Sequence, residues 1–410
     1  MKLFVVLLAL CALSAAKRFF HGDQVLRLHP TEDHHFQAIA TLEESFPIDY
    51  WTDLYGNKPV DIHVPKKYLP RVKVFLRRNR LNFEIFIEDL QKAIDEQVTD
   101  RALQLNLATF DYNVYHTMDE INGWIDDMAS TYSTATKVDI GSTYEGKTIH
   151  GLKISTGGFN RPAFFIDCGI HAREWVAPAS CMYAVKYLVE ATSGSDEYNL
   201  LQNIDFYVVP VANPDGYLYT WSGDRMWRKT RSNNNKVCVG VDPNRNWDIN
   251  WSGPGASSSS CNDAYYGPSA MSEVEVQGQG NYLRSIPNLK GYIDVHAYSQ
   301  YWMYPYAYSY STCPDDTFLR SVATESASAI KAVHGTTYQS GPISEVIYQA
   351  SGSTTDYVYQ EIGVKCAFAA ELRDTGRYGF TLPERFIQPT AEETFAGLKV
   401  IASYVANGQC

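Results

Sequence analysis

The sequence lacks the signatures of several common classes of protein. It has no Cys-x-x-Cys pair, which leaves a structural zinc ribbon without support. It has no Gly-x-Ser-x-Gly motif, so an activated-serine hydrolase is not supported either. Basic residues are outnumbered, at 35 Lys and Arg against 46 Asp and Glu, and the formal net charge is −11. Because phosphate backbones require a basic surface, this balance argues against nucleic acid as a partner.

Long apolar runs are also missing after the first residues of the chain. Lys2 precedes an apolar run from Leu3 to Leu13, and small residues follow at positions 14–16. A short apolar run between a basic residue and a small-residue cleavage site is typical of a secretory signal peptide, and it is too short to span a bilayer. We therefore predict a signal peptide over residues 1–16, a secreted, extracellular protein and no membrane association.

Secretion makes disulfides plausible. The chain has eight cysteines, and Cys11 lies in the predicted signal peptide, so an odd number remains, at positions 168, 181, 238, 261, 313, 366 and 410. At least one thiol is then free or pairs outside the chain. Spacing alone does not give the connectivity. Cys366 falls in a predicted strand, where a buried thiol is expected.

Residues 17–101 have the pattern of a small α+β unit. Val60–Val64 and Leu81–Ile85 alternate apolar and polar residues, which predicts half-buried strands of a sheet covered on one face. Residues 31–45, 66–79 and 89–100 suit amphipathic helices, so we expect an α+β open sandwich. Arg101 follows in a stretch without clear periodicity. It is either a cleavage site for a trypsin-like protease or an ordinary linker residue.

From about residue 110 the pattern changes to an alternation of buried strands and helices. Nearly continuous apolar runs occupy 163–166, 206–209, 292–295 and 367–370, which predicts strands buried on both faces. Helical patterns occupy 175–191, 271–286, 316–333 and 388–406. The expected fold class is α/β, with a mixed, mostly parallel open sheet and helices on both faces.

Ionisable residues follow three of these strands. His171 and Glu174 come after the first strand, His296 after the third and Glu371 after the fourth. Open α/β sheets bind ligands at the carboxyl ends of their strands, so these groups are expected to converge. Two histidines and one carboxylate suit a catalytic zinc ion. On position alone, hydrogen-bonded turn residues are the more common interpretation.

Five sequence blocks occur in an order that resembles the secreted digestive metallocarboxypeptidases of the A and B types. They are HAREW (171–175), WRKTRS (227–232), DPNRNW (242–247), IYQASG (347–352) and ELRDTGRYGF (371–380). The resemblance covers nearly the whole chain after the signal peptide. It implies a carboxypeptidase-like fold, an inhibitory activation domain over residues 17–101, cleavage after Arg101 and a zinc enzyme over residues 102–410.

The resemblance also implies a role for each matching residue at the reaction centre. His171, Glu174 and His296 would bind one zinc ion, and Asp242 would orient a ligand histidine. Glu371 would be the general base, and Arg228 would stabilise the developing oxyanion. Without the resemblance, Glu371 could equally form a salt bridge with a neighbouring arginine, and Arg228 and Arg245 would be solvated surface charges.

Further matching residues would bind the substrate, a peptide or protein C-terminus. Asn244 and Arg245 would hold the terminal carboxylate, and Tyr348 would close over the site. Arg173, Tyr298 and Phe380 would line the next subsite. The specificity pocket would contain five residues, namely Ile343, Ile347, Ala350, Thr355 and Ala369.

Thr355 stands where B-type enzymes carry an acidic residue, so we expect A-type preference for apolar or aromatic C-terminal residues. The alternatives are B-type specificity for Lys and Arg, and a catalytically inactive binder of peptide C-termini. The resemblance further implies disulfides Cys168–Cys181 and Cys238–Cys261. We expect a monomer whose partners are its substrate and a trypsin-like activating protease.

Overall fold

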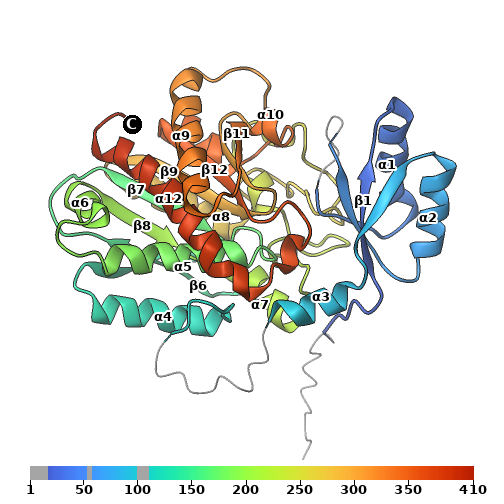
Figure 1. Cartoon of the computed structure of the whole chain (residues 1–410), viewed down its shortest axis with the longest axis horizontal. Coiled ribbons are helices and arrows are strands. Elements are labelled where there is room, and N and C mark those ends of the chain that lie inside the picture. The colour runs from blue at the N-terminus through green and yellow to red at the C-terminus, as the bar shows by residue number, and fades with distance from the viewer. Residues whose placement is uncertain (1–16, 53–57, 99–109) are drawn as a thin grey trace, which may run out of the picture.

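The computed structural model describes residues 17–52, 58–98 and 110–410, which fold around two sheets (Figure 1). The predicted signal peptide and the predicted cleavage site at Arg101 lie outside the described residues. Among the described residues, no helix is both long and apolar enough to cross a membrane.

The first sheet is small and antiparallel, with strand order β2-β3-β1-β4. Its strands are β1 (Gln24–His29), β2 (Asp49–Tyr50), β3 (Val60–Val64) and β4 (Asn82–Ile87). Helices α1 (Asp33–Ser45) and α2 (Leu69–Arg78) cover one face and share a hydrophobic core with it. Helix α3 (Leu90–Gln97) leads toward the larger part of the molecule (Figure 1). This arrangement is the expected open sandwich.

The prediction that strand Val60–Val64 is only half-buried is wrong. All five of its residues are buried, including the polar Asp61 and His63. The uncovered face of the small sheet lies against the large domain, and these side chains find partners there or within the sheet. Asp61 accepts hydrogen bonds from Arg27 and from the Tyr298 hydroxyl of the large domain, and His63 lies 2.9 Å from Asp23. The alternation of polar and apolar residues in this strand therefore indicates an interface with the large domain rather than a solvent-exposed face.

The second sheet has eight strands in the order β11-β10-β12-β9-β7-β8-β6-β5. The four strands at its centre, β12, β9, β7 and β8, run parallel, and antiparallel pairs join β10 to β12, β8 to β6 and β6 to β5. The strands are β5 (Ala135–Ser142), β6 (Thr148–Ile154), β7 (Ala163–Cys168), β8 (Asp205–Val209), β9 (Leu289–Ala297), β10 (Tyr301–Tyr304), β11 (Gln339–Pro342) and β12 (Cys366–Leu372).

Helices cover both faces of this sheet, as expected. Successive residues of a strand point to opposite faces. Phe165 of β7 packs against Tyr282 of α8, whereas the ring of Phe164 lies near Val405 of α12, on the other face. The helices are α4 (Met118–Thr131), α5 (Val176–Val189), α6 (Asp196–Asn203), α7 (Pro214–Ser222), α8 (Val274–Ser285), α9 (Asp316–His334), α10 (Ile343–Val346), α11 (Thr354–Tyr357) and α12 (Ile387–Ala406).

Three disulfides connect parts of the large domain. Cys168 is bonded to Cys181 and Cys238 to Cys261, the two pairs that the resemblance implied. The third bond joins Cys366 to Cys410, two cysteines whose state the sequence left open, so Cys366 is not a free buried thiol. Cys313 is the buried cysteine left free in the described part of the chain.

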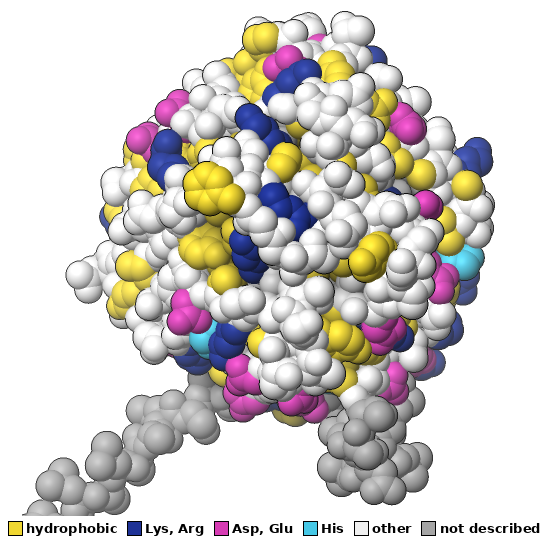
Figure 2. Space-filling view, turned by 90° about the vertical axis from the view of Figure 1, so that its left-hand side faces the viewer, with side chains coloured by type: hydrophobic (Ala, Val, Ile, Leu, Met, Phe, Trp, Pro, Cys, Tyr) yellow, Lys and Arg dark blue, Asp and Glu magenta, His cyan; other side chains and the backbone are white. Residues whose placement is uncertain are grey.

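Figure 2 shows the end of the molecule away from the small sheet, where charges of both signs are scattered among polar and hydrophobic side chains.

Candidate functional site

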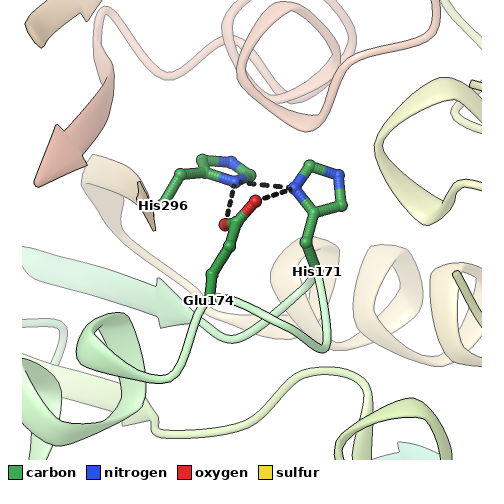
Figure 3. A group of neighbouring side chains, drawn as sticks. All are labelled: His171, Glu174 and His296. Atoms are coloured by element: carbon green, nitrogen blue, oxygen red, sulfur yellow. Dashed lines mark hydrogen bonds and ion pairs between the residues drawn. The ribbon is translucent and has the colours of Figure 1, made fainter. Parts of the chain in front are cut away.

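Three predicted ligand side chains, His171, Glu174 and His296, point at one another at the end of the central strands (Figure 3). The Nδ1 atom of His171 lies 2.8 Å from Glu174 Oε1 and 3.1 Å from His296 Nδ1, and His296 Nδ1 lies 3.1 Å from Glu174 Oε2. One donor atom from each residue lies within 4.8 Å of the others, and all three side chains are buried. Two imidazole nitrogens and one carboxylate in this geometry are a fitting donor set for zinc.

The turn between β7 and α5 places two of these ligands. Gly169 follows the last residue of β7 with a φ of +67°, and an added Cβ would lie 3.1–3.2 Å from Pro178, Pro210 and Val211. Glycine is therefore required for the tight exit from the strand. His171 and Glu174 follow on this turn, and the Cys168–Cys181 bond joins the end of the strand to α5. His296 lies on the neighbouring strand β9.

Asp242 connects His171 to Arg228. Its Oδ1 atom lies 3.1 Å from His171 Nε2, and its Oδ2 atom accepts hydrogen bonds of 3.1 and 2.9 Å from Arg228. Burial raises the pKa of Asp242, but Arg228 and His171 outweigh burial and hold this pKa well below its usual range. Arg228 also lies 3.6 Å from Glu174. Both Arg228 and Arg245 are largely buried, so the interpretation of solvated surface charges is wrong.

Glu371 lies beside His296 because strands β12 and β9 are parallel neighbours in which these two residues are paired. Its Oε2 atom is buried and has no hydrogen-bond partner within the described ranges. Burial, together with the nearby Glu174 carboxylate, raises the pKa of Glu371 to about 8 despite the opposing effect of His296. A buried carboxyl oxygen that lacks a partner and lies beside the ligand cluster is suited to exchange a proton with a bound reactant.

The predicted carboxylate clamp is partly assembled. Arg245 donates to the Tyr348 hydroxyl at 3.1 Å, and Gly352 in a left-handed conformation (φ +73°) packs directly against the Arg245 backbone. Asn244 lines the same cleft, but its amide donates to Asp294 and its carbonyl accepts from the Thr354 backbone. Sequence reasoning did not identify Asp294, whose Oδ2 atom lies 2.8 Å from His296 Nε2.

The predicted specificity pocket is apolar. Met303, Ala307, Val346 and the predicted Ile343, Ala350 and Ala369 form one buried cluster, against which Ile347 and Tyr348 pack. Thr355 lies in the same wall of the cleft, and its hydroxyl donates to the Phe368 carbonyl at 3.4 Å. The adjacent Asp356 is directed away, toward the backbone N–H groups of Ala307 and Tyr308.

The small domain forms one wall of this cleft, which has a volume of about 510 Å³. Arg173, one of the predicted subsite residues, donates to Asp49 at 3.0 and 3.1 Å and to the Tyr50 carbonyl. Trp51 packs edge-on against Phe380, with ring centroids 5.0 Å apart, and also against Tyr298. Groups from the small domain therefore contact all three predicted subsite residues, Arg173, Tyr298 and Phe380.

Comparisons with known proteins identify the family to which the chain belongs. The model of the family described as zinc carboxypeptidase matches residues 121–397, and that of the carboxypeptidase activation peptide matches residues 26–97. The chain belongs to the zinc carboxypeptidase family. It is a metallocarboxypeptidase of the procarboxypeptidase type, in which the small sheet is the activation domain.

The resemblance to procarboxypeptidases extends over whole chains. The sequence is 42% identical to carboxypeptidase A2 of Rattus norvegicus over 416 residues, covering 99% of each chain. It is 38% identical to carboxypeptidase B of Canis lupus familiaris over 413 residues, covering 98% of each. The crystal structure of thrombin activatable fibrinolysis inhibitor (TAFI) superposes with a TM-score of 0.88 at 37% identity and covers 95% of this chain and 100% of its own.

Proposed function

We propose that the enzyme removes single apolar or aromatic residues from the C-termini of peptides and proteins, with one zinc ion held by His171, Glu174 and His296. The observation that carries the preference is the apolar cluster around Met303 and Ala369, together with a neutral Thr355 where a basic side chain would need a carboxylate. Burying a substrate cation in this pocket without a carboxylate partner would cost roughly several kcal/mol of binding free energy, before any gain from packing contacts.

A zinc ion held by His171, Glu174 and His296 would act as a Lewis acid toward the scissile carbonyl and would lower the pKa of the attacking water. Glu371 would take the proton from that water and return it to the leaving amine, because its buried Oε2 atom has no other hydrogen-bond partner among the described residues. Arg228, fixed by Asp242 and lying beside Glu174, presents a preorganised positive charge to the oxygen that becomes negative.

Arg245 accounts for the restriction to chain ends. Its guanidinium is buried at the base of the cleft next to Tyr348 and is suited to pair with a terminal carboxylate, with Asn244 beside it. An internal peptide bond offers no such carboxylate and is therefore poorly positioned for attack. The contact of Tyr348 with this arginine supports the proposal that Tyr348 closes the site.

The activation domain blocks substrate in the uncleaved chain by the contacts to Arg173, Tyr298 and Phe380. We propose that a trypsin-like protease cuts after Arg101 and releases residues 102–410 from residues 17–101. Residues 1–16 direct secretion, and the released enzyme acts as a monomer. An inactive binder of C-termini is not favoured, because His171, Glu174, His296, Glu371 and Arg228 all line the same cleft, which supports a catalytic role.

One experiment tests the mechanism and the preference together. The purified protein is treated with trypsin, and release of C-terminal Phe, Leu and Arg is measured from peptides that are otherwise identical. We expect faster release of Phe and Leu, and loss of all release with a zinc chelator. Glu371→Gln should lower the turnover number about 100- to 10,000-fold, the range for a general base. It should leave bound zinc, measured by atomic absorption, unchanged.

Faster release of Arg than of Phe would refute the preference. Activity that survives complete metal removal would refute the zinc mechanism. Equal rates before and after trypsin treatment would refute the inhibitory role of the activation domain.

A further inference from the structure

Strand β9 carries a second carboxylate directly below the ligand His296. Asp294 and His296 are two residues apart, so their side chains leave the same face of the strand. Asp294 is completely buried, and its Oδ2 atom lies 2.8 Å from His296 Nε2. Asn244 donates its amide N–H to the same oxygen at 3.1 Å. The carboxylate therefore faces the ring nitrogen that points away from the ligand cluster.

The arrangement repeats that of the other ligand histidine. In both His171 and His296, Nδ1 lies in the cluster with Glu174, while Nε2 lies against a buried aspartate, Asp242 or Asp294. An N–H bond from one ring nitrogen to a carboxylate fixes the tautomer, so that the other nitrogen keeps its lone pair for a metal. It also fixes the plane of the ring and makes the imidazole a stronger donor.

We propose that Asp294 is a positioning residue for the metal site, holding the His296 ring with its Nδ1 lone pair directed at the zinc position. This proposal rests on the zinc site proposed above. It gives the site two oriented histidines instead of one, with the carboxylates supplied by different parts of the chain. Asp242 comes from the loop before a short helical turn, and Asp294 comes from the central sheet.

The surroundings of Asp294 argue against a role in stability alone. Asp167 is the residue paired with it on the neighbouring strand β7. One oxygen of each carboxyl group is buried without a hydrogen-bond partner in the described part of the chain. A fold selected only for stability gains nothing from two such groups side by side, because each unpaired buried oxygen costs free energy.

Asp167 provides a matched control inside the same pair. It accepts hydrogen bonds from Tyr292 and from Gln279 of α8, and among the described residues it forms no hydrogen bond to His171, Glu174 or His296. Burial and the Asp294 carboxylate raise the pKa of Asp167 well above its usual range. Asp167→Asn therefore alters the same buried pair without touching the ligand histidine.

The test compares zinc binding in the trypsin-activated Asp294→Ala, Asp294→Asn and Asp167→Asn variants with that of the activated wild type. Affinity is measured by competition with a chromophoric chelator, and the ligand field by the visible spectrum of the cobalt-substituted proteins. We expect Asp294→Ala to bind zinc about 10- to 100-fold more weakly, as is typical when the partner of a ligand histidine is removed. We also expect its cobalt spectrum to shift.

Asp294→Asn keeps an acceptor for the His296 N–H and should recover part of the lost affinity, whereas Asp167→Asn should bind zinc as the wild type does. Thermal unfolding of the metal-free variants shows whether each is folded, and if Asp294→Ala is not, Asp294→Asn and Asp294→Ser carry the comparison. Wild-type zinc affinity and an unchanged cobalt spectrum in the folded Asp294 variants would overturn the proposal. A wild-type protein that binds no zinc would instead refute the proposed site itself.

Discussion

Trp51 offers the sharpest test of how the activation domain holds the cleft closed. Its side chain is only 6% exposed and packs against Phe380 and Tyr298 of the catalytic domain. It belongs to the hydrophobic cluster of the large domain and not to the core shared by α1, α2 and the small sheet. Trp51→Ala should therefore weaken docking while leaving the activation domain folded.

The size of the effect follows from the buried area. A Trp side chain buries about 200 Å², and at about 25 cal/mol per Å² its full transfer from water is worth about 5 kcal/mol. Ala keeps part of this contact, and Trp51 also bonds to Asp49 within its own domain. We therefore expect about 2 kcal/mol of docking free energy to be lost, in the range of an interface hot spot. That loss opens the cleft about 30-fold more often.

The assay measures peptide hydrolysis by uncleaved protein, whose integrity is verified by intact mass. Uncleaved Trp51→Ala should show about 30-fold more residual activity than uncleaved wild type if residual activity reports the open fraction. After trypsin treatment the two should have equal kcat/KM. Ile85→Ala is the control, since Ile85 lies on the same small sheet but is 42% exposed. Equal residual activity in uncleaved Trp51→Ala and Ile85→Ala would refute the reasoning.

Two further predictions concern the pocket and the stability of the fold. Thr355→Asp should place a carboxylate in the apolar pocket and raise the ratio of Arg to Phe release by about 100-fold, a change of about 3 kcal/mol. Thr355→Asn is the control for size, and an unchanged ratio measured on matched peptides would contradict the assignment. Burial raises the pKa of Glu275 from 4.5 to about 7 in the folded protein. The folded state then binds this proton more tightly, so the contribution of Glu275 to stability is greatest below about pH 4.5 and falls by about 3 kcal/mol as the pH rises past 7. Glu275→Gln should remove this decrease, which denaturant unfolding at pH 5 and pH 8 would measure. The same pH dependence in both proteins would contradict the prediction.

The residues that could be predicted from sequence are those with a local signature. His171 and Glu174 lie three positions apart on one turn, and His296 and Glu371 each stand at the end of a continuous apolar strand. The end of a buried strand can be recognised in the sequence, because a strand buried on both faces has few polar residues and they reappear where the strand ends. The central strands β7, β8, β9 and β12 were predicted for the same reason.

The features that were missed depend on contacts between distant segments. Strands β5, β6, β10 and β11 at the sheet edges carry mixed patterns that do not separate them from loops. Asp294 lies within an apolar run, and its partners can be recognised only in the folded structure, where β9 lies beside β7 and near Asn244. Asp61 was read as solvent-facing because alternation does not distinguish water from a polar interface.

Glu371 and His296 are paired across neighbouring strands, so their relative position does not depend on the loops around the site. Adjacent strands stay about 4.8 Å apart whatever their loops contain, because backbone hydrogen bonds set that spacing. Glu371 and His296 are thus anchored to the sheet, whereas Tyr348 and Ile347 lie on the chain between α10 and α11. Substitutions in that connection would leave the position of Glu371 relative to His296 unchanged. A library that varies Ile347, Gln349 and Ala350 and keeps Tyr348, Gly352, β9 and β12 is therefore a direct route to new specificities on this scaffold.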